Sequence, residues 1–278
     1  MKILIVGLGL IGGSYAKGLI KKGYEVYGID TNKETREFAL KNEIVTAVSD
    51  NPLSFINDVD VLILGLYPND IIDFLNKYSP YFSNDLIITD VCGIKTSFVY
   101  KVNDVLKHGE YISHHPMAGR EKIGITYADE KIFKGANFLV TPINNSKRAI
   151  DTIMQIGSDL EFGKFFIMTP EHHDQMIAFT SQLTHAIAVS LVNSDHNLDT
   201  KNYIGDSYRD LTRIAMINEN LWSELFMENK SYLLAQIAEF EAELNLLKDA
   251  LANNNSNQLK ELFISSRKKR SGMEKWKS

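Results

Sequence analysis

The sequence predicts an α/β domain with a mostly parallel sheet, followed by a domain built only of helices. Two observations predict this order. In residues 1–168, short apolar runs rich in β-branched residues alternate with polar turns and helical patterns, which is typical of parallel strands buried on both faces. In residues 169–278, helical periodicity continues without a convincing strand. We therefore expect a domain boundary between residues 168 and 169.

Each predicted strand is a short apolar segment that ends at a polar turn. The strands expected to build the parallel sheet cover residues 3–6, 26–29, 61–66, 86–91 and 111–113. Residues 138–140 and 165–167 have the same character, and we expect them to close this sheet as two further strands.

The second domain is expected to contain two long helices. Residues 176–192 are apolar around much of the helix circumference, which predicts a buried helix. In the other helix, apolar side chains at spacings near three and four form a seam of Leu234, Ile237, Phe240, Leu244, Leu247 and Leu251. Such a seam fits equally the core-facing side of a monomer's helix and a subunit interface.

The composition is that of an ordinary globular protein, with 44% hydrophobic and 23% charged residues. Cys92 is the single cysteine, so an intrachain disulfide and a cysteine-based zinc site are excluded. The net charge of −5 opposes binding to nucleic acid, and the basic run at residues 267–270 fits a solvated helix end. The apolar runs are too short for a signal peptide or a membrane span. We expect a cytoplasmic protein with no metal site and no membrane partner.

A glycine-rich motif, Gly7-Leu8-Gly9-Leu10-Ile11-Gly12, lies between the first predicted strand and a helix. Its first glycine permits a tight turn, the second lets the backbone approach a pyrophosphate, and the third lets helix and strand pack closely. The second strand ends in Asp30, eighteen residues after Gly12, where a carboxylate binds ribose hydroxyls. The pattern predicts a Rossmann-type domain that binds NAD, since Asp30 would repel the 2′-phosphate of NADP. The predicted cofactor-binding residues here are Gly7, Gly9, Leu10, Ile11, Gly12 and Asp30.

The candidate catalytic residue is His115. It follows the fifth predicted strand in the run His114-His115-Pro116-Met117-Ala118-Gly119-Arg120-Glu121. Ligands of such sheets bind at the carboxyl ends of the strands, and a histidine there can act as a general base near neutral pH. A lone histidine at a strand end is more often structural, but the proline, the glycine and the Arg-Glu pair that follow are unusual for packing alone.

These motifs together resemble those of the prephenate/arogenate dehydrogenase family, and the resemblance covers essentially the whole chain. In the first half it rests on the glycine-rich motif extended to Gly13-Ser14, on Thr89-Asp90-Val91 with Lys95, and on the run from His115 to Glu121. In the second half it rests on His173-Asp174, Ser181-x-Leu183-x-His185, and Arg209-Asp210-Leu211-Thr212-Arg213-Ile214-Ala215 followed by Trp222.

The resemblance implies NAD-dependent oxidative decarboxylation of prephenate to 4-hydroxyphenylpyruvate in tyrosine biosynthesis. Its amino analogue arogenate, which gives tyrosine directly, is the alternative substrate. His115 would take the proton from the ring hydroxyl while hydride leaves that carbon for the nicotinamide, and aromatisation would favour loss of the ring carboxylate. The resemblance and the apolar seam also imply a homodimer formed through the helical domain.

Five further residues match family positions that contact the substrate or control access to it. Arg213 matches an arginine that binds a carboxylate, for which a planar and always charged guanidinium is suited. Arg209 would add positive potential. His185 matches a histidine at the substrate side chain, Glu121 a member of a gating ionic network, and Trp222 a tryptophan that the partner subunit brings near that network.

Some of these residues also have simpler interpretations. Arg209 and Arg213 lie one helical turn apart and could form surface ion pairs with Asp210 or Glu219. His172-His173-Asp174 could ligate a metal, but the ligand spacing of zinc sites is missing, so a helix cap is the expected role. His185, on an apolar helix, would by itself be interpreted as a core histidine.

Two places depart from the family pattern. Gly93 stands where many members have a serine whose hydroxyl helps to bind the reacting region. We include Gly93 among the predicted cofactor-binding residues and expect water, or the hydroxyl of Thr96 or Ser97, to replace that serine. Gln182 and Thr184 stand where the family has histidine and proline, which would alter recognition of the substrate side chain.

Two other functions fit the same fold. A β-hydroxyacid dehydrogenase would need a Lys-x-x-x-Asn pair on the first helix of the second domain, and residues 171–194 contain no lysine. A catalytically silent NAD-binding sensor is favoured only by Gly93. The joint presence of His115, Arg209 and Arg213 favours an enzyme instead.

Overall fold

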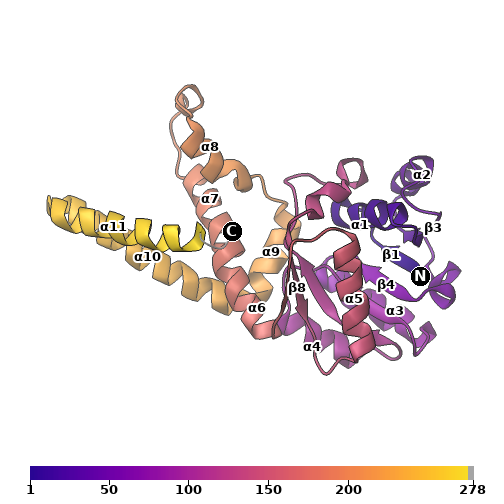
Figure 1. Ribbon diagram of the computed structural model, residues 1–278. Coiled ribbons are helices and arrows are strands. Elements are labelled where there is room, and N and C mark those ends of the chain that lie inside the picture. Colours follow the sequence, from indigo (N-terminus) through magenta and orange to yellow (C-terminus); the bar gives the residue numbers. More distant parts are fainter. Residues whose placement is uncertain (275–278) are drawn as a thin grey trace. The chain divides into compact units, whose positions relative to one another are not determined.

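The computed structural model describes residues 1–274 and divides into two compact units, Met1–Lys230 and Ser231–Ser278. The first unit contains an α/β half and several of the helices that follow it (Figure 1). The predicted fold class, a Rossmann-type α/β domain followed by a helical one, is confirmed.

A six-stranded parallel sheet forms the centre of the α/β half. Its strand order is β3-β2-β1-β4-β5-β6, as in dinucleotide-binding folds. The elements are β1 (Lys2–Val6), α1 (Leu10–Lys21), β2 (Glu25–Ile29), α2 (Lys33–Lys41), β3 (Ala47–Ser49), β4 (Val61–Leu64), α3 (Pro68–Tyr78), β5 (Ile87–Asp90), α4 (Thr96–Val105) and β6 (Glu110–Tyr111). The sequence did not predict β3, because its three residues are only half-buried and form no apolar run.

Both faces of this sheet are covered, as the near-continuous apolar strands predict. Alternate residues of a strand point to opposite faces. On β1, Ile3 and Ile5 pack with α1 and α5 (Lys147–Asp159), whereas Leu4 and Val6 pack with α3 and α4. All four side chains are at most 4% exposed. This burial fixes the carboxyl edge of the sheet, from which the loops that build the site extend.

The last two predicted strands do not close the parallel sheet, and this part of the prediction is wrong. A separate three-stranded sheet contains β7 (Ser113–Pro116), β8 (Asn137–Thr141) and β9 (Lys164–Ile167). β7 is antiparallel to β8, and β8 is parallel to β9. The predicted strand at residues 111–113 is divided between the two sheets, because the chain leaves β5 after Tyr111 and then pairs with β8. His115 therefore lies within a strand and not after one.

The helical half of the first unit begins with one continuous helix. Its parts are α6 (Pro170–Ile177), a π-helical segment (Ala178–Gln182) and α7 (Leu183–Asn193), and α8 (Asp206–Thr212) and α9 (Glu219–Glu228) follow. Thr169 caps the first turn, because its hydroxyl accepts a hydrogen bond from the His172 N–H at 3.2 Å. π-Helical turns re-aim the side chains that follow them and are frequent at functional sites.

The helix predicted at residues 176–192 is formed, but in the single chain it is not buried as expected. Met176, Phe179 and Val192 are 42%, 52% and 39% exposed. By length and composition alone, the helix Pro170–Asn193 is long and apolar enough to cross a membrane, which the sequence pattern did not suggest. One such helix is weak evidence for a membrane span. Its first turns also carry the buried polar side chains of His173 and Asp174.

The second unit consists of most of α10 (Lys230–Ala252) and of α11 (Ser256–Glu274). α10 carries the predicted apolar seam, and its Leu234, Leu244 and Leu251 are more than half exposed. A short connection, residues 253–255, joins α10 to α11. The basic run at residues 267–270 lies in the last turns of α11.

Candidate active site

The glycine-rich motif forms the turn between β1 and α1. Gly7 has a φ of +88°, and a Cβ on Gly12 would lie 1.9 Å from the Gly7 carbonyl oxygen, so both positions require glycine. Gly9 precedes α1, and open space surrounds the position that its Cβ would take. No side chain caps α1, and its first turn contains no acidic residue. Its first N–H groups are therefore available to a phosphate, as the NAD pyrophosphate requires.

Asp30 lies next to this turn, directly after β2. Its Oδ2 accepts a hydrogen bond from the Leu8 N–H at 2.9 Å, and its Oδ1 accepts one from the Asn32 N–H at 2.8 Å. Each carboxylate oxygen keeps a lone pair for a ribose hydroxyl. Arg36, the nearby cation, donates to the Asp30 carbonyl at 2.6 Å and pairs with Asp50 at 3.3 Å. The residues present therefore fit NAD.

One cavity of about 900 Å³ connects the glycine-rich turn with the predicted chemical site. Its walls come from the loops after β1, β4 and β5, from β7 and the run after it, from the π-helical turn, and from α9 with the segment before it. The predicted site residues that line it are Gly9, Leu10, Ile11, Gly93, His115, Glu121, His185, Arg213 and Trp222. Gly7, Gly12, Asp30 and Arg209 do not line it. The volume suits a cofactor and a small substrate.

His115 has one ring nitrogen bonded within the protein and its other edge near the cavity wall. Its Nδ1 is 2.9 Å from Nε2 of His173, whose Nδ1 is 2.7 Å from Oδ1 of Asp174. Its Nε2 is 3.8 Å from the position of a Cβ on Gly93. Burial lowers the pKa of His115 well below its ordinary value, and the charge of Lys95 lowers it further. The imidazole is therefore neutral near pH 7, the state that a general base needs.

A buried ion pair holds the loop between β5 and α4. Lys95 Nζ donates to Oδ1 of Asp90 and to the carbonyl oxygen of His114, both at 2.8 Å, and both charged side chains are fully buried. Burial alone raises the pKa of Asp90, but Lys95 and the hydroxyls of Ser113 and Tyr111 outweigh it and lower the pKa. The sequence motif contains Asp90 and Lys95 without revealing this role, because spacing does not show that a charged pair is buried.

His114, the neighbour of His115, is engaged on both ring nitrogens. Its Nδ1 is 2.6 Å from the Thr89 hydroxyl, and its Nε2 is 2.7 Å from the Tyr15 hydroxyl. Burial lowers the pKa of His114 to about 3. His114 does not line the cavity, so it is not an alternative base.

Arg213 and Glu121 form an ion pair across the cavity wall, with side chains that are 62% and 31% exposed. At such exposure an ion pair contributes about 1 kcal/mol or less, so it can exchange for a substrate carboxylate. Arg209 is not brought to this site. Its side chain is 64% exposed and pairs with Asp206 at 2.6 Å, which fits the simpler interpretation of a surface ion pair.

His185 and Trp222 form an aromatic wall of the cavity. Their rings are stacked with centroids 3.7 Å apart, and the His185 Nδ1–H donates to the Ser181 carbonyl at 2.9 Å. Burial lowers the pKa of His185, although the Ser181 carbonyl opposes this shift. The resemblance implies a tryptophan from a partner subunit, whereas here the chain's own Trp222 lines its own cavity.

Gly93 has room for a side chain. Its φ is not positive, and a Cβ would lie 3.7 Å or more from its neighbours, which is ordinary contact. The two hydroxyls expected to replace the family serine do not line the cavity. Ser97 donates to Glu228, and the buried Thr96 Oγ1 has no hydrogen-bond partner in the described part of the chain.

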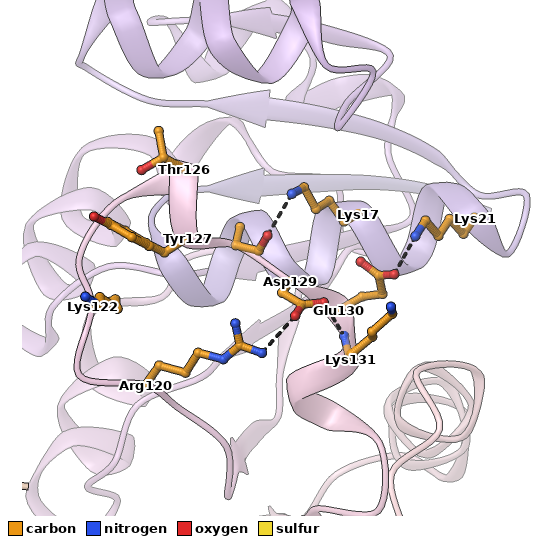
Figure 2. Close-up of a pocket in the computed structure, with 10 residues that line it drawn as sticks. Lys17, Lys21, Arg120, Lys122, Thr126, Tyr127, Asp129, Glu130 and Lys131 are labelled. Atoms are coloured by element: carbon orange, nitrogen blue, oxygen red, sulfur yellow. Dashed lines mark hydrogen bonds and ion pairs between the residues drawn. The ribbon is translucent and has the colours of Figure 1, made fainter. Parts of the chain in front are cut away.

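Polar contacts hold the segment from Arg120 to Lys131, and some of them join it to α1 (Figure 2). Lys17 Nζ donates to the Ala128 carbonyl at 2.7 Å, and Arg120 pairs with Asp129 at 2.8 Å. These residues line a second cavity of about 570 Å³. Among residues 1–274, no group of three or more His, Cys, Asp or Glu side chains is placed to hold a metal ion.

Two family models match consecutive parts of the chain. Residues 15–165 match the model of the prephenate dehydrogenase nucleotide-binding domain, and residues 169–265 match that of the prephenate dehydrogenase dimerization domain. The prephenate dehydrogenase of Bacillus subtilis (strain 168) is 28% identical over 98% of this chain and 76% of its own length.

Solved structures are similar over nearly the whole chain. Prephenate dehydrogenase from Aquifex aeolicus, in complex with hydroxyphenyl propionate and NAD+, superimposes with a TM-score of 0.89 at 29% identity and covers 98% of both chains. Synechocystis arogenate dehydrogenase gives a TM-score of 0.83 at 26% identity, over 98% of this chain and 100% of its own. Because the family models cover most of the sequence, this chain belongs to the prephenate dehydrogenase family of NAD-dependent oxidoreductases.

Proposed function

We propose that the protein catalyses the NAD-dependent oxidative decarboxylation of prephenate to 4-hydroxyphenylpyruvate, a step of tyrosine biosynthesis. The position of His115 carries this proposal. Its neutral imidazole adjoins a cavity that also contains the N-terminus of α1 and the Arg213–Glu121 pair. A base, a helix end that binds anions and a guanidinium are the groups needed to hold a dinucleotide and a dianionic substrate during proton removal.

When bound, NAD supplies the hydride acceptor. His115 Nε2 takes the proton of the ring hydroxyl as the hydride leaves the ring carbon that bears this hydroxyl. Loss of the ring carboxylate as carbon dioxide then gives an aromatic ring, which makes the overall reaction favourable. Arg213 binds a substrate carboxylate in place of Glu121, and His185 with Trp222 lines the space for the substrate side chain.

The two halves of the chain have separate tasks in this proposal. Residues 1–168 bind NAD, with the turn from Gly7 to Gly12 at the pyrophosphate, Asp30 at a ribose and Gly93 at the reacting end. Residues 169–278 provide substrate contacts and the dimer interface. The boundaries of the two family models, at residues 165 and 169, support this division.

A homodimer in the cytoplasm is the proposed state of the protein. The match of residues 169–265 to a dimerization domain supports the dimer, as do the exposed apolar side chains Met176, Phe179 and Val192. Burial of these side chains by a second copy would remove apolar surface from water. Light scattering at micromolar concentration tests this, and a fully active monomer would contradict it.

The activity is tested by mixing the protein with NAD and either prephenate or arogenate and following the absorbance of NADH. Prephenate should give NADH and 4-hydroxyphenylpyruvate, identified by mass spectrometry. A higher kcat/KM with arogenate would make the protein an arogenate dehydrogenase. Binding of NAD without NADH formation from either substrate would contradict the proposal and favour a silent sensor.

A further inference from the structure

We propose that His173 is a positioning residue that fixes the tautomer of His115, and that Asp174 in turn fixes the tautomer of His173. This inference rests on the proposed function, because it takes His115 as the base. The three side chains form one hydrogen-bonded row, with 2.9 Å between the two imidazoles and 2.7 Å between His173 and the carboxylate. His173 is fully buried, and Asp174 is nearly so.

Asp174 sets which atom donates in each hydrogen bond of the row. Its Oδ1 accepts the backbone N–H of Lys95 at 2.8 Å, and its Oδ2 accepts that of Thr96 at 2.6 Å. Both oxygens thus accept backbone N–H groups, an arrangement that suits a carboxylate, which only accepts hydrogen bonds. The hydrogen bond between Asp174 and His173 therefore requires the proton on Nδ1 of His173.

The remaining two protonation sites follow from this one. Burial lowers the pKa of His173, so its imidazole is neutral near pH 7, and a neutral imidazole with its proton on Nδ1 has a bare Nε2. That Nε2 accepts the Nδ1–H of His115. His115, also neutral, then has a bare Nε2 on the edge nearest Gly93, where a substrate hydroxyl can reach it. The opposite tautomer would present an N–H to the cavity, and such a group cannot accept a proton.

The row is held by both halves of the first unit. His115 lies on β7, whereas His173 and Asp174 lie on α6. Asn229, the residue directly after α9, holds α6 in place. Its side-chain amide donates to the Asp174 carbonyl at 3.0 Å and to Oε1 of Gln182 at 2.7 Å. His115 therefore has its catalytic tautomer fixed only where α6 is docked against the α/β half.

Substitutions of His173 distinguish the proposed positioning role from a purely structural one better than substitutions of Asp174. Asp174 caps α4 through two backbone amides, so substitution there would disturb folding as well as the row. The Nε2 of His173 bonds to His115 and to no other residue of the row. Substitutions of His173 therefore test the row more selectively. His173→Leu removes the acceptor, whereas His173→Gln supplies a carbonyl oxygen in its place. His172→Leu, at the exposed neighbouring position, is the matched control.

Steady-state kinetics with NAD and prephenate separates these variants. His173→Leu should lower kcat roughly 10- to 100-fold, less than loss of the base itself, with KM and NAD affinity nearly unchanged. His173→Gln should recover most of kcat, and His172→Leu should match the wild type. Wild-type kcat in a folded His173→Leu, with His115→Asn inactive, would overturn the tautomer proposal and leave the proposed function intact. An active His115→Asn would instead contradict the base of the proposed function.

The tautomers can also be measured in the unaltered protein, should His173→Leu fail to fold. Nitrogen-15 NMR of the histidine-labelled wild type distinguishes protonated from bare ring nitrogens, and His115→Asn identifies the His115 signals among the seven histidines. We expect a protonated Nδ1 and a bare Nε2 for both His115 and His173 near pH 7. A protonated Nε2 on His115 would overturn the proposal.

Discussion

Replacing Gly93 by serine is the change most directly suggested by the structure. The backbone at Gly93 does not have a positive φ, and a Cβ would meet its neighbours at 3.7 Å or more, so serine fits without strain. That Cβ would lie 3.8 Å from Nε2 of His115, which allows the serine hydroxyl to reach this nitrogen or a substrate oxygen beside it. Neither Thr96 nor Ser97 lines the cavity to supply a hydroxyl already.

Two separate effects are expected in this variant, one on kcat and one on the stability of the folded protein. A hydrogen bond near the reacting oxygen is worth about 0.5–1.5 kcal/mol, which corresponds to roughly a 2- to 10-fold rise in kcat if it forms in the transition state. Replacing glycine at a compatible position stabilises the folded protein by about 0.4–1 kcal/mol, because the unfolded chain loses freedom. For a protein of this size, that raises Tm by roughly 1–3 °C.

Gly93→Ala is the matched control, because it adds the Cβ without the hydroxyl. The assay follows NADH formation from NAD and prephenate, with Tm measured on the same samples. Gly93→Ser should be faster than wild type, whereas Gly93→Ala should share the gain in Tm but not the gain in kcat. Equal kcat in the two variants would show that the hydroxyl finds no partner. A Gly93→Ser no faster than wild type would show that the hydroxyl adds no such bond, and either result would refute the reasoning.

Three further outcomes are expected. His115→Asn should lower kcat about 100- to 10,000-fold at nearly unchanged KM, because asparagine cannot accept the proton; wild-type turnover would show another base. NAD should be used far more efficiently than NADP, because Asp30 repels a 2′-phosphate, and comparable kcat/KM values would disprove this role. The free energy of unfolding in urea should fall as pH decreases below about 6.5, because burial lowers the pKa of His114 to about 3 and the unfolded state takes up the proton first. This one group contributes up to about 1.4 kcal/mol per pH unit, and an equally steep fall in His114→Asn would exclude it as the cause.

The nucleotide turn was predictable because its determinants are local. The strand, the turn and the helix N-terminus are adjacent in the chain. Glycine is required at Gly7 by its positive φ and at Gly12 by the Gly7 carbonyl oxygen of the same turn. Asp30 lies beside the turn because β2 pairs directly with β1. That His115 belongs to the site was predictable for a related reason, since it lies in one contiguous motif and lines the cavity. Its place within β7 of the second sheet was not predictable.

Other features depended on contacts between distant segments. Arg209 and Arg213 are spaced as neighbours on one helix face, but α8 ends at Thr212 and a 3₁₀ turn, Arg213–Ala215, follows, so only Arg213 reaches the cavity. Residues 111–113 are likewise divided between two sheets, because Tyr111 pairs with β5 and Ser113 pairs with β8. Apolar periodicity is the same for either partner, so the pattern alone did not decide it.

The sequence by itself determined the fold class and the cofactor turn, and it predicted His115 as the base. Tertiary structure decided how that base is held, because the bond from His115 to His173 joins residues 58 positions apart. It also decided that Lys95 and Asp90 form a buried pair and that Thr96 and Ser97 do not line the cavity. Local sequence fixes backbone conformation over a few residues, whereas burial and the partner of a polar group depend on which distant elements pack around it.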